Sequence, residues 1–260
     1  MPLVLYVLAL AVFAQGTSEF VLAGLLPGLA SDLDVSLGQA GLLTSAFAVG
    51  MVVGAPVMAA VGRRLSPRWS MSGFLALFIV AHVIGAVADS FGILLAMRVV
   101  AALANAGFLA VALSTVAQLV PDQMRARALA IILGGTTLAL IAGVPAGALV
   151  GSALGWRATL WAIAIVSVPA LAAVLCATPT RTTPSGQWAP GRSLSGELRT
   201  LLLRPVQANI ASAVLVNAAT FCSFTYLAAI AAGPARIGEP MIPLLLGVFG
   251  VGAFLGVQVA

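Results

Sequence analysis

Charged side chains are scarce in this sequence. Only 7% of its 260 residues are Asp, Glu, Lys or Arg, against roughly 25% in an average soluble domain. Lysine is absent, so all 12 basic residues are arginine, and 7 residues are acidic. Such a chain has too little polar surface to cover a water-soluble globule of this length. The composition therefore excludes an ordinary cytosolic protein.

Cysteine and histidine are scarce as well. The two cysteines, Cys176 and Cys222, lie inside apolar runs, and His82 is the single histidine. These residues cannot form a disulfide framework or a zinc site. The arginines do not alternate with aromatic residues in basic blocks, as they would on a nucleic-acid-binding surface. We therefore predict no cofactor, no metal site and no nucleic-acid partner, and no enzymatic activity because the apolar runs contain no recognisable catalytic pair.

Long apolar runs are what the sequence has instead. Hydrophobic residues make up 62% of it, and its mean hydropathy is +1.15. An α-helix of about 20 such residues spans a bilayer and satisfies its own backbone polar groups there. We predict an all-α membrane protein with eight spans, at about residues 3–29, 39–61, 70–88, 91–119, 128–151, 158–176, 206–230 and 241–260.

The arginines fall mainly in alternate loops. Nine lie in the loops after the second, fourth and sixth predicted spans, whereas the other loops hold Arg157 and Arg236. Cytoplasmic loops are enriched in basic residues, so we predict a multi-pass protein of the cell membrane with a cytoplasmic N-terminus. The run from Leu3 to Ala14 resembles a signal peptide, but no basic residue precedes it and it continues to Leu29, which favours a span. Four acidic residues are predicted on the outer side: Asp32, Asp34, Asp89 and Glu239.

One segment differs from the rest in composition. Residues 178–204 are rich in Pro, Thr, Ser and Gly and carry four arginines against the single acid Glu197. This bias predicts a cytoplasmic linker. The predicted domains are therefore a six-span bundle at 1–177, the central linker at 178–204, and the first two spans of a second bundle at 205–260.

The sequence contains two internal repeats. Gly54-Ala55-Pro56 followed by Gly62, and Gly143-Val144-Pro145 followed by Gly151, share the pattern G-x-P-x5-G in spans that run in opposite directions. A second repeat, in spans of the same direction, pairs residues at an offset of 202: Phe47, Val49, Gly50, Gly54 and Val57 with Phe249, Val251, Gly252, Gly256 and Val259. An inverted repeat within six spans and a parallel repeat between halves are the plan of the major facilitator superfamily.

Several stretches closely resemble drug:proton antiporters of that superfamily, of the chloramphenicol-resistance exporter type. They are AVFAQGTSEFVLAGLLPG (11–28), GLLTSAFAVGMVVGAP (41–56), RVVAALANAGFLAVAL (98–113), AGVPAGALVG (142–151), GWR (155–157) and NAATFCSFTYLA (217–228). The resemblance implies the major facilitator fold, with a complete N-terminal six-helix bundle. It also implies twelve spans, so we expect the second bundle to be incomplete here.

The resemblance implies proton-coupled export of small amphiphilic drugs, chloramphenicol among them, by alternating access. The partners would then be the drug, protons and the lipid bilayer. Two alternatives remain open at this point. One is export of a sugar or metabolite on the same fold, and the other is a truncated membrane fragment that does not transport.

Glu19 is the only acidic residue inside a predicted span, roughly 15 Å from the outer surface at the rise of an α-helix. A carboxyl group in low dielectric favours its neutral form, so we predict that Glu19 carries the proton. The alternative is a structural acid, permanently neutral or paired with arginine.

Arg98 occupies the place of the arginine that opens the family's span-four motif, and the resemblance gives it a part in proton coupling. It lies about 12 Å below the outer surface. An unpaired guanidinium at such depth costs at least ~2.5 kcal/mol. The alternative is that its side chain extends to the outer surface.

A set of small residues in the fifth span resembles the family's antiporter motif. Gly135 and Ala139 precede it at spacings of four, which places all of them on one helix face where another helix can approach closely. Packing alone would explain this face, whereas the resemblance adds a seal against proton leak. The motif residues are Gly143, Pro145, Gly147 and Gly151.

Two further groups complete the candidate site. Polar and aromatic residues predicted to bind substrate, or alternatively to make helix contacts, are Asn105, Asn217, Thr220, Phe221, Phe224 and Tyr226. The predicted cytoplasmic gate loop consists of Gly62, Arg63, Arg64 and Arg68. That loop departs from the family pattern because it has no acid between Val61 and Trp69, so its arginines also fit a role in topology and phospholipid contact.

Overall fold

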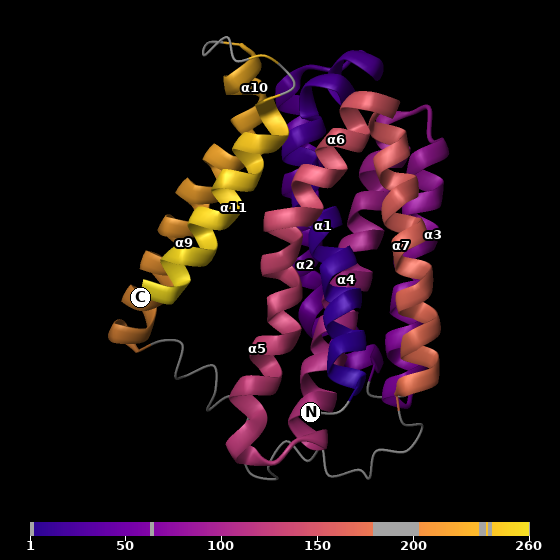
Figure 1. The fold of residues 1–260 in the computed structure, drawn as a ribbon, viewed down its shortest axis with the longest axis vertical. Helices are drawn as coiled ribbons and strands as arrows, with labels where there is room; N and C mark the ends of the chain where they lie inside the picture. Colours follow the sequence, from indigo (N-terminus) through magenta and orange to yellow (C-terminus); the bar gives the residue numbers. More distant parts are fainter. Residues whose placement is uncertain (1–2, 63–64, 179–202, 234–237, 239–240, 260) are drawn as a thin grey trace.

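The computed structural model describes residues 3–62, 65–178, 203–233, 238 and 241–259 (Figure 1). These residues form helices joined by short connections. The helices are α1 (Leu3–Asp32), α2 (Leu37–Gly62), α3 (Pro67–Val87), α4 (Phe91–Leu119), α5 (Asp122–Leu138), the π-helix η1 (Ala139–Gly143), α6 (Val144–Leu154), α7 (Trp156–Ala177), α9 (Arg204–Thr225), α10 (Leu227–Ala232) and α11 (Ile242–Val259). The predicted all-α class is confirmed.

Seven helices in the described ranges are long and apolar enough to cross a bilayer, counting Asp122–Leu154 as one, and Ile242–Leu255 is a shorter apolar helix. The chain is therefore a multi-pass membrane protein. The fifth span begins at Asp122, six residues before its predicted start at 128. Asp122 lies in the first turn of α5, where its negative charge interacts favourably with the helix dipole. Its carboxylate is 2.9 Å from the Arg125 guanidinium. These charged residues add a polar turn before the apolar part of the span.

Helices α1 to α7 form one bundle, and α9, α10 and α11 lie to one side of it (Figure 1). At the end opposite the N-terminus, α10 and α11 approach the bundle, where they contact α1, η1 and α6. Towards the N-terminal end α9 and α11 lean away. A second buried cluster, which includes Ala23, Ala148, Phe224 and Leu246, joins the two parts.

The bundle packs as an inverted repeat requires. Helix α2 packs chiefly on α4, whereas α5, η1 and α6 pack on α1; in the same way α3 packs on α4 and α7 on α1. The helices α2 and α3 of the first half thus pack on α4 of the second half, and α5 to α7 of the second half pack on α1 of the first. The repeated glycines lie at these contacts, since a Cβ on Gly54 would be 3.0 Å from Leu103 of α4, and one on Gly143 would overlap Thr17 of α1.

The fifth predicted span, 128–151, consists of more than one helical segment in the structure. It contains the π-helical segment η1 directly before Pro145. Proline lacks an N–H and its ring clashes with the carbonyl four residues earlier, here that of Ile141, and a π-turn is one way to relieve such a break. The segment lies where helices meet, because a Cβ on Gly16 of α1 would be 3.1 Å from Ala139 and one on Gly250 of α11 only 2.6 Å from the Leu140 carbonyl oxygen.

The seventh predicted span, 206–230, is divided in the structure. Helix α9 ends at Thr225 and α10 begins at Leu227, because Tyr226 has the non-helical dihedrals φ −100° and ψ 8°. Tyr226 packs against α2, where a Cβ on Gly41 would overlap its hydroxyl oxygen and lie 3.1 Å from Cζ. This tertiary contact accompanies a break that the local hydropathy does not signal.

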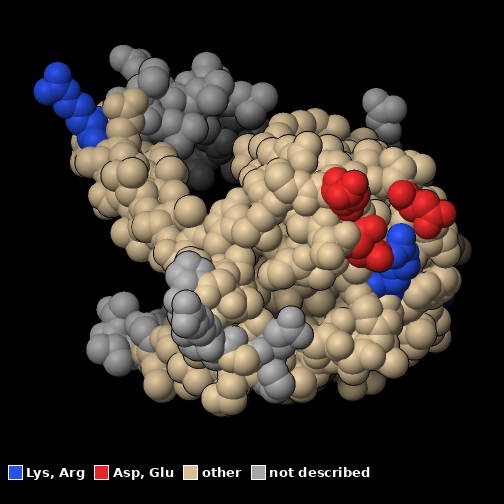
Figure 2. All heavy atoms as spheres, turned by 90° about the horizontal axis from the view of Figure 1, so that it is seen from above, with Lys and Arg blue, Asp and Glu red and all other residues tan. Residues whose placement is uncertain are grey.

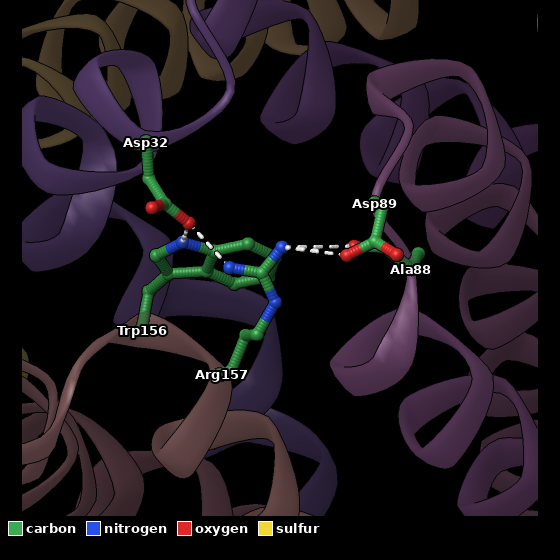
Figure 3. Close-up of polar contacts among 5 residues, drawn as sticks. All are labelled: Asp32, Ala88, Asp89, Trp156 and Arg157. Atoms are coloured by element: carbon green, nitrogen blue, oxygen red, sulfur yellow. Dashed lines mark hydrogen bonds and ion pairs between the residues drawn. The ribbon is translucent and has the colours of Figure 1, made fainter.

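The end of the bundle opposite the N-terminus carries a charged cluster. Figure 2 shows acidic side chains gathered around a basic one on this face, and Figure 3 shows the contacts. Arg157 is ion-paired with Asp32 and donates to the Ala88 carbonyl at 3.1 Å, with Asp89 at 3.5 Å, while Trp156 Nε1 donates to Asp32 at 2.8 Å. The cluster ties the end of α1 to the α3–α4 connection and to the start of α7.

Neighbouring glycines of α5 offer a matched test of the close approach to α1. A Cβ on Gly135 would overlap the Ala9 carbonyl oxygen and lie 3.2 Å from Val12 Cβ and 3.0 Å from Phe13 N, whereas nothing lies within 4 Å of one on Gly134. We expect Gly135→Ala to cost about 1–3 kcal/mol of folding stability by overpacking and Gly134→Ala to be neutral or slightly stabilising. Thermal unfolding of the detergent-solubilised protein measures both, and equal transitions would contradict the close packing.

Candidate functional site

Glu19 lines a cavity of about 170 Å³ between α1, α2 and α9. It lies midway along α1 and is partly exposed. The other lining residues are all uncharged: Phe20, Ala23, Thr44, Phe47, Ala48, Phe221, Phe224 and Thr225. The cavity therefore offers one carboxyl group, two hydroxyl groups and a set of aromatic faces.

The aromatic rings of this cavity pack on one another. The Phe20 and Phe221 rings are stacked with centroids 5.4 Å apart and planes at 9°, and Phe224 meets Phe20 edge-on at 6.3 Å. Phe224 also lies 4.6 Å from Phe249 of α11. Phe224 is fully buried, whereas Phe221 is 36% exposed and so presents ring surface for a ligand.

Arg98 of α4 lies against α1 beside this cavity. It is 3% exposed, so the predicted alternative of a side chain extended to the outer surface is wrong. Its Nη1 donates to Ser18 Oγ at 2.9 Å and its Nη2 donates to the Ser18 carbonyl at 3.2 Å. The guanidinium carbon lies 4.4 Å from the centroid of the Phe47 ring, which adds a cation–π contact. Hydrogen bonds to α1 thus hold both terminal nitrogens of the guanidinium, whereas its buried Nε has no hydrogen-bond partner among the described residues.

Glu19 and Arg98 do not form a direct ion pair. Within the described residues, the ion pairs closer than 4.0 Å join Arg125 to Asp122 and Arg157 to Asp32 and Asp89. Arg98 is instead held on the residue that precedes Glu19. The carboxyl group of Glu19 is therefore free to face the cavity.

Ser18 also contacts His82 of α3. Its Oγ is 2.6 Å from His82 Nε2, and His82 Nδ1 is 2.8 Å from the Phe78 carbonyl oxygen. Ser18 and His82 are both buried. The described residues contain no group of three or more potential metal ligands.

The small residues of the antiporter motif face α1. A Cβ on Gly143, Gly147 or Gly151 would overlap Thr17, Val21 and Leu25 respectively. Thr17, Val21 and Leu25 recur every four residues on α1, on a different face from Glu19, Phe20 and Ala23, which line the cavity. The glycines of the motif thus pack on one face of α1, and Glu19 lies on the opposite face of the same helix.

The remaining predicted substrate residues are not brought to this cavity. Asn105 is buried within α4, and Asn217 and Thr220 are exposed on α9, where Thr220 Oγ1 donates to the Val216 carbonyl at 2.8 Å. Tyr226 contacts Gly41 instead. Of the six predicted residues, Phe221 and Phe224 line the cavity with Glu19.

Sequence reasoning missed several lining residues. Thr44, Phe47 and Ala48 come from α2 and Thr225 from α9. Their spacing on α2 is i, i+3, i+4, which marks one helix face, so a search for polar and aromatic residues at that spacing would have found Thr44 and Phe47. The sequence of α2 does not indicate that α1 and α9 are the helices that complete the cavity with it.

The structure places little of the predicted gate loop. Arg63 and Arg64, and the predicted linker from residue 179 to 202, lie outside the described residues. Gly62 ends α2, and Arg68 lies in the first turn of α3 with its guanidinium carbon 5.9 Å from the centroid of the Trp69 ring.

Membrane-spanning helices arranged as an inverted repeat are a common plan among membrane transport proteins. The family model of the Major Facilitator Superfamily matches residues 8–260. The chain belongs to the Major Facilitator Superfamily. The predicted family is confirmed.

Two curated relatives illustrate the similarity. The chain is 53% identical over 261 residues to the chloramphenicol resistance protein of Streptomyces lividans, covering 100% of this chain and 66% of the relative. It is 31% identical over 252 residues to the inner membrane transport protein YdhP of Escherichia coli K12, covering 97% of this chain and 64% of the relative. The chain thus spans slightly less than two thirds of the length of each.

Solved structures share the fold. The crystal structure of a bacterial homologue of the human lysosomal transporter Spinster, in an inward-facing and occupied conformation, superposes with a TM-score of 0.79 at 19% identity. The superposition covers 97% of this chain and 60% of that one. This likeness supports the major facilitator fold that the sequence predicts.

Proposed function

We propose that this chain belongs to a proton-coupled exporter of small amphiphilic drugs, with chloramphenicol as its substrate. The observation that carries the proposal is the position of Glu19, the one acidic residue in a phenyl-lined cavity between α1, α2 and α9. The 53% identity to a chloramphenicol resistance protein supports the choice of drug.

The chemistry of the cavity suits an aromatic amphiphile. A nitrophenyl ring can stack on the exposed face of Phe221, while hydroxyl and amide groups of the drug can bond Thr44, Thr225 and the Glu19 carboxyl. Drug and proton then compete for the same carboxyl group. Such competition couples inward proton movement to outward drug movement.

The energy for export is then drawn from the proton gradient. Each proton that crosses contributes about 2.3 kcal/mol per 100 mV of membrane potential. In this proposal Arg98, held on Ser18, supplies the positive charge nearest to Glu19 and so adjusts its proton affinity. The close contact of the Gly143–Gly151 face with α1 limits proton leak behind the carrier helix.

We also propose that the N-terminus is cytoplasmic and that the described conformation is open to the cytoplasm. Helices α9 and α11 lean away from the bundle at the N-terminal end (Figure 1), whereas Tyr226, between α9 and α10, packs on Gly41 of α2. Arg68 in the first turn of α3, and Arg125 and Arg127 near the start of α5, support this orientation. Alternating access then opens the Tyr226–Gly41 contact and closes the N-terminal end.

Accumulation of labelled chloramphenicol tests the proposed function. Pump-deficient bacteria express the chain, its membrane insertion is verified, and an uncoupler is added midway. We expect low accumulation that rises to the level of empty cells on uncoupling. Accumulation at the empty-cell level throughout, in cells with inserted protein, would contradict drug export, and an effect competed away by sugars but not by phenicols would contradict the substrate.

Phe221 offers a test of the drug-binding surface. Phe221→Ala removes the ring that stacks on Phe20 and lines the cavity, and loss of about 0.5–1.5 kcal/mol of stacking predicts roughly 2- to 12-fold weaker drug binding. Phe254, 41% exposed on α11 and outside the lining set, provides the control Phe254→Ala. Equilibrium binding of labelled drug to solubilised protein measures both; equal affinities would place the drug elsewhere.

A further inference from the structure

Among the described residues, His82 is the buried titratable group near the cavity that has no role in the proposed mechanism. It lies on α3, 3% exposed, and its ring is 4.2 Å from Phe78. It does not line the Glu19 cavity. Its contacts nevertheless lead to Glu19 through two other residues.

The hydrogen bonds assign the tautomer of His82. The Phe78 carbonyl can only accept, so His82 Nδ1 carries a proton and donates at 2.8 Å. Arg98 Nη1 can only donate, so the Ser18 hydroxyl accepts that bond at 2.9 Å. The same hydroxyl is 2.6 Å from His82 Nε2, and its own proton is satisfied only if Nε2 accepts it. The chain of bonds therefore requires a neutral imidazole.

The guanidinium of Arg98 is held at two points of one residue, the side-chain hydroxyl and the main-chain carbonyl of Ser18. Nη1 bonds the Ser18 hydroxyl and Nη2 bonds the Ser18 carbonyl, which belongs to the peptide that joins Ser18 to Glu19. A serine hydroxyl rotates about one bond, so its direction is set by its acceptor. With His82 Nε2 as that acceptor, the lone pairs of Ser18 are presented to the guanidinium.

We propose that His82, acting through Ser18, is a positioning residue that holds Arg98 away from a direct ion pair with Glu19 and thereby sets the pH range in which Glu19 exchanges its proton. This inference rests on the proposed function. Without the His82 acceptor, the Ser18 hydroxyl turns and Arg98 loses one of its two anchors. A released guanidinium moves towards the carboxyl group of Glu19, the residue that follows Ser18 on α1 and whose charge acts on Arg98.

The charged and titratable groups that face Glu19 are few. Arg98 of α4 is the charged neighbour, and His82 of α3 stands behind it. The residues contributed to the cavity by α2 and α9 are Thr44, Phe47, Ala48, Phe221, Phe224 and Thr225, none of which titrates. A change in the protonation of Glu19 can therefore be traced to the Arg98 position.

Infrared titration of the Glu19 carboxyl band tests the proposal without transport. The solubilised full chain is titrated over roughly pH 4 to 10, which covers the ordinary range of these groups, and the band is assigned by its loss in Glu19→Gln. We expect His82→Leu and Ser18→Ala to move the midpoint by about half a pH unit or more. His82→Gln keeps an acceptor oxygen for the Ser18 hydroxyl, so its midpoint stays at that of the unsubstituted chain.

The outcomes separate the two ideas. An unchanged midpoint in both His82→Leu and Ser18→Ala, or a shift in His82→Gln as large as theirs, overturns the positioning role while the proton carrier stands. A Glu19 band that does not titrate at all in the unsubstituted chain overturns the proposed function, and this inference with it. If His82→Leu fails to insert, Ser18→Ala and His82→Gln carry the comparison alone. A merely structural His82 changes thermal stability but not the midpoint.

Discussion

Glu19→Gln is expected to abolish uncoupler-sensitive drug export while leaving the protein inserted and folded. The amide has the size of the protonated carboxyl group but cannot release a proton, so the cycle loses its coupling step. The partly exposed position of Glu19 in the cavity allows the substitution without repacking. The initial rate of chloramphenicol efflux from energised membrane vesicles, normalised to inserted protein, measures the effect.

Glu19→Asp is the matched control because it keeps an ionisable group. One methylene less withdraws the carboxyl from Thr44 and Phe221 across the cavity, so export is expected to persist at a reduced rate. Drug binding at equilibrium is expected to weaken in Glu19→Gln, since that variant resembles the protonated state, with which the drug competes. Export by Glu19→Gln at the unsubstituted rate would remove Glu19 from the proton pathway.

Arg98→Met is expected to have the second largest effect, a loss of roughly tenfold or more in energised export, equivalent to about 1.4 kcal/mol. Methionine keeps much of the apolar stem but removes the charge nearest to Glu19 and both bonds to Ser18. The buried hydroxyl and carbonyl of Ser18 then lose their donors, which costs stability as well. Efflux rate and thermal unfolding are measured on the same preparations to separate the two effects.

Arg98→Lys distinguishes charge from geometry. A lysine keeps the positive charge, but its single ammonium cannot bond the Ser18 hydroxyl and carbonyl as a planar fork does. We expect export between that of Arg98→Met and that of the unsubstituted chain. Export by Arg98→Met equal to the unsubstituted rate, at equal stability, would show that this arginine has no part in coupling.

Sequence reasoning identified Glu19 because a carboxyl group inside an apolar run is expensive and therefore conspicuous. It identified the glycine face for a similar reason, since small residues at spacings of four lie on one side of any helix. It could not say that this face contacts Thr17, Val21 and Leu25 of α1. Which helix fills a small-residue groove depends on all the spans together.

The same limit explains the substrate residues. Asn217, Thr220, Phe221 and Phe224 lie within eight positions of one another, and all were equally eligible by composition. Their spacing of i, i+3, i+4 and i+7 places all four on one face of α9, but only Phe221 and Phe224, near the C-terminal end of the helix, line the cavity, whereas Asn217 and Thr220 lie nearer the start of the helix and are exposed. Which part of that face meets other helices is decided by packing against Phe20 and Phe249, which are far away in the sequence.

The sequence by itself determined that the chain lies in a lipid bilayer, that it is helical, where its spans approximately lie and that charge is rare within them. Hydropathy and length are local properties of the sequence, and they decide whether a helix is stable in lipid. Only the tertiary structure decided that Arg98 bonds Ser18 rather than Glu19, that His82 completes this chain of bonds, and that Tyr226 interrupts the seventh span. Each depends on which faces of distant helices meet, and a hydrogen bond has no local signature when its partners are 64 or 80 residues apart.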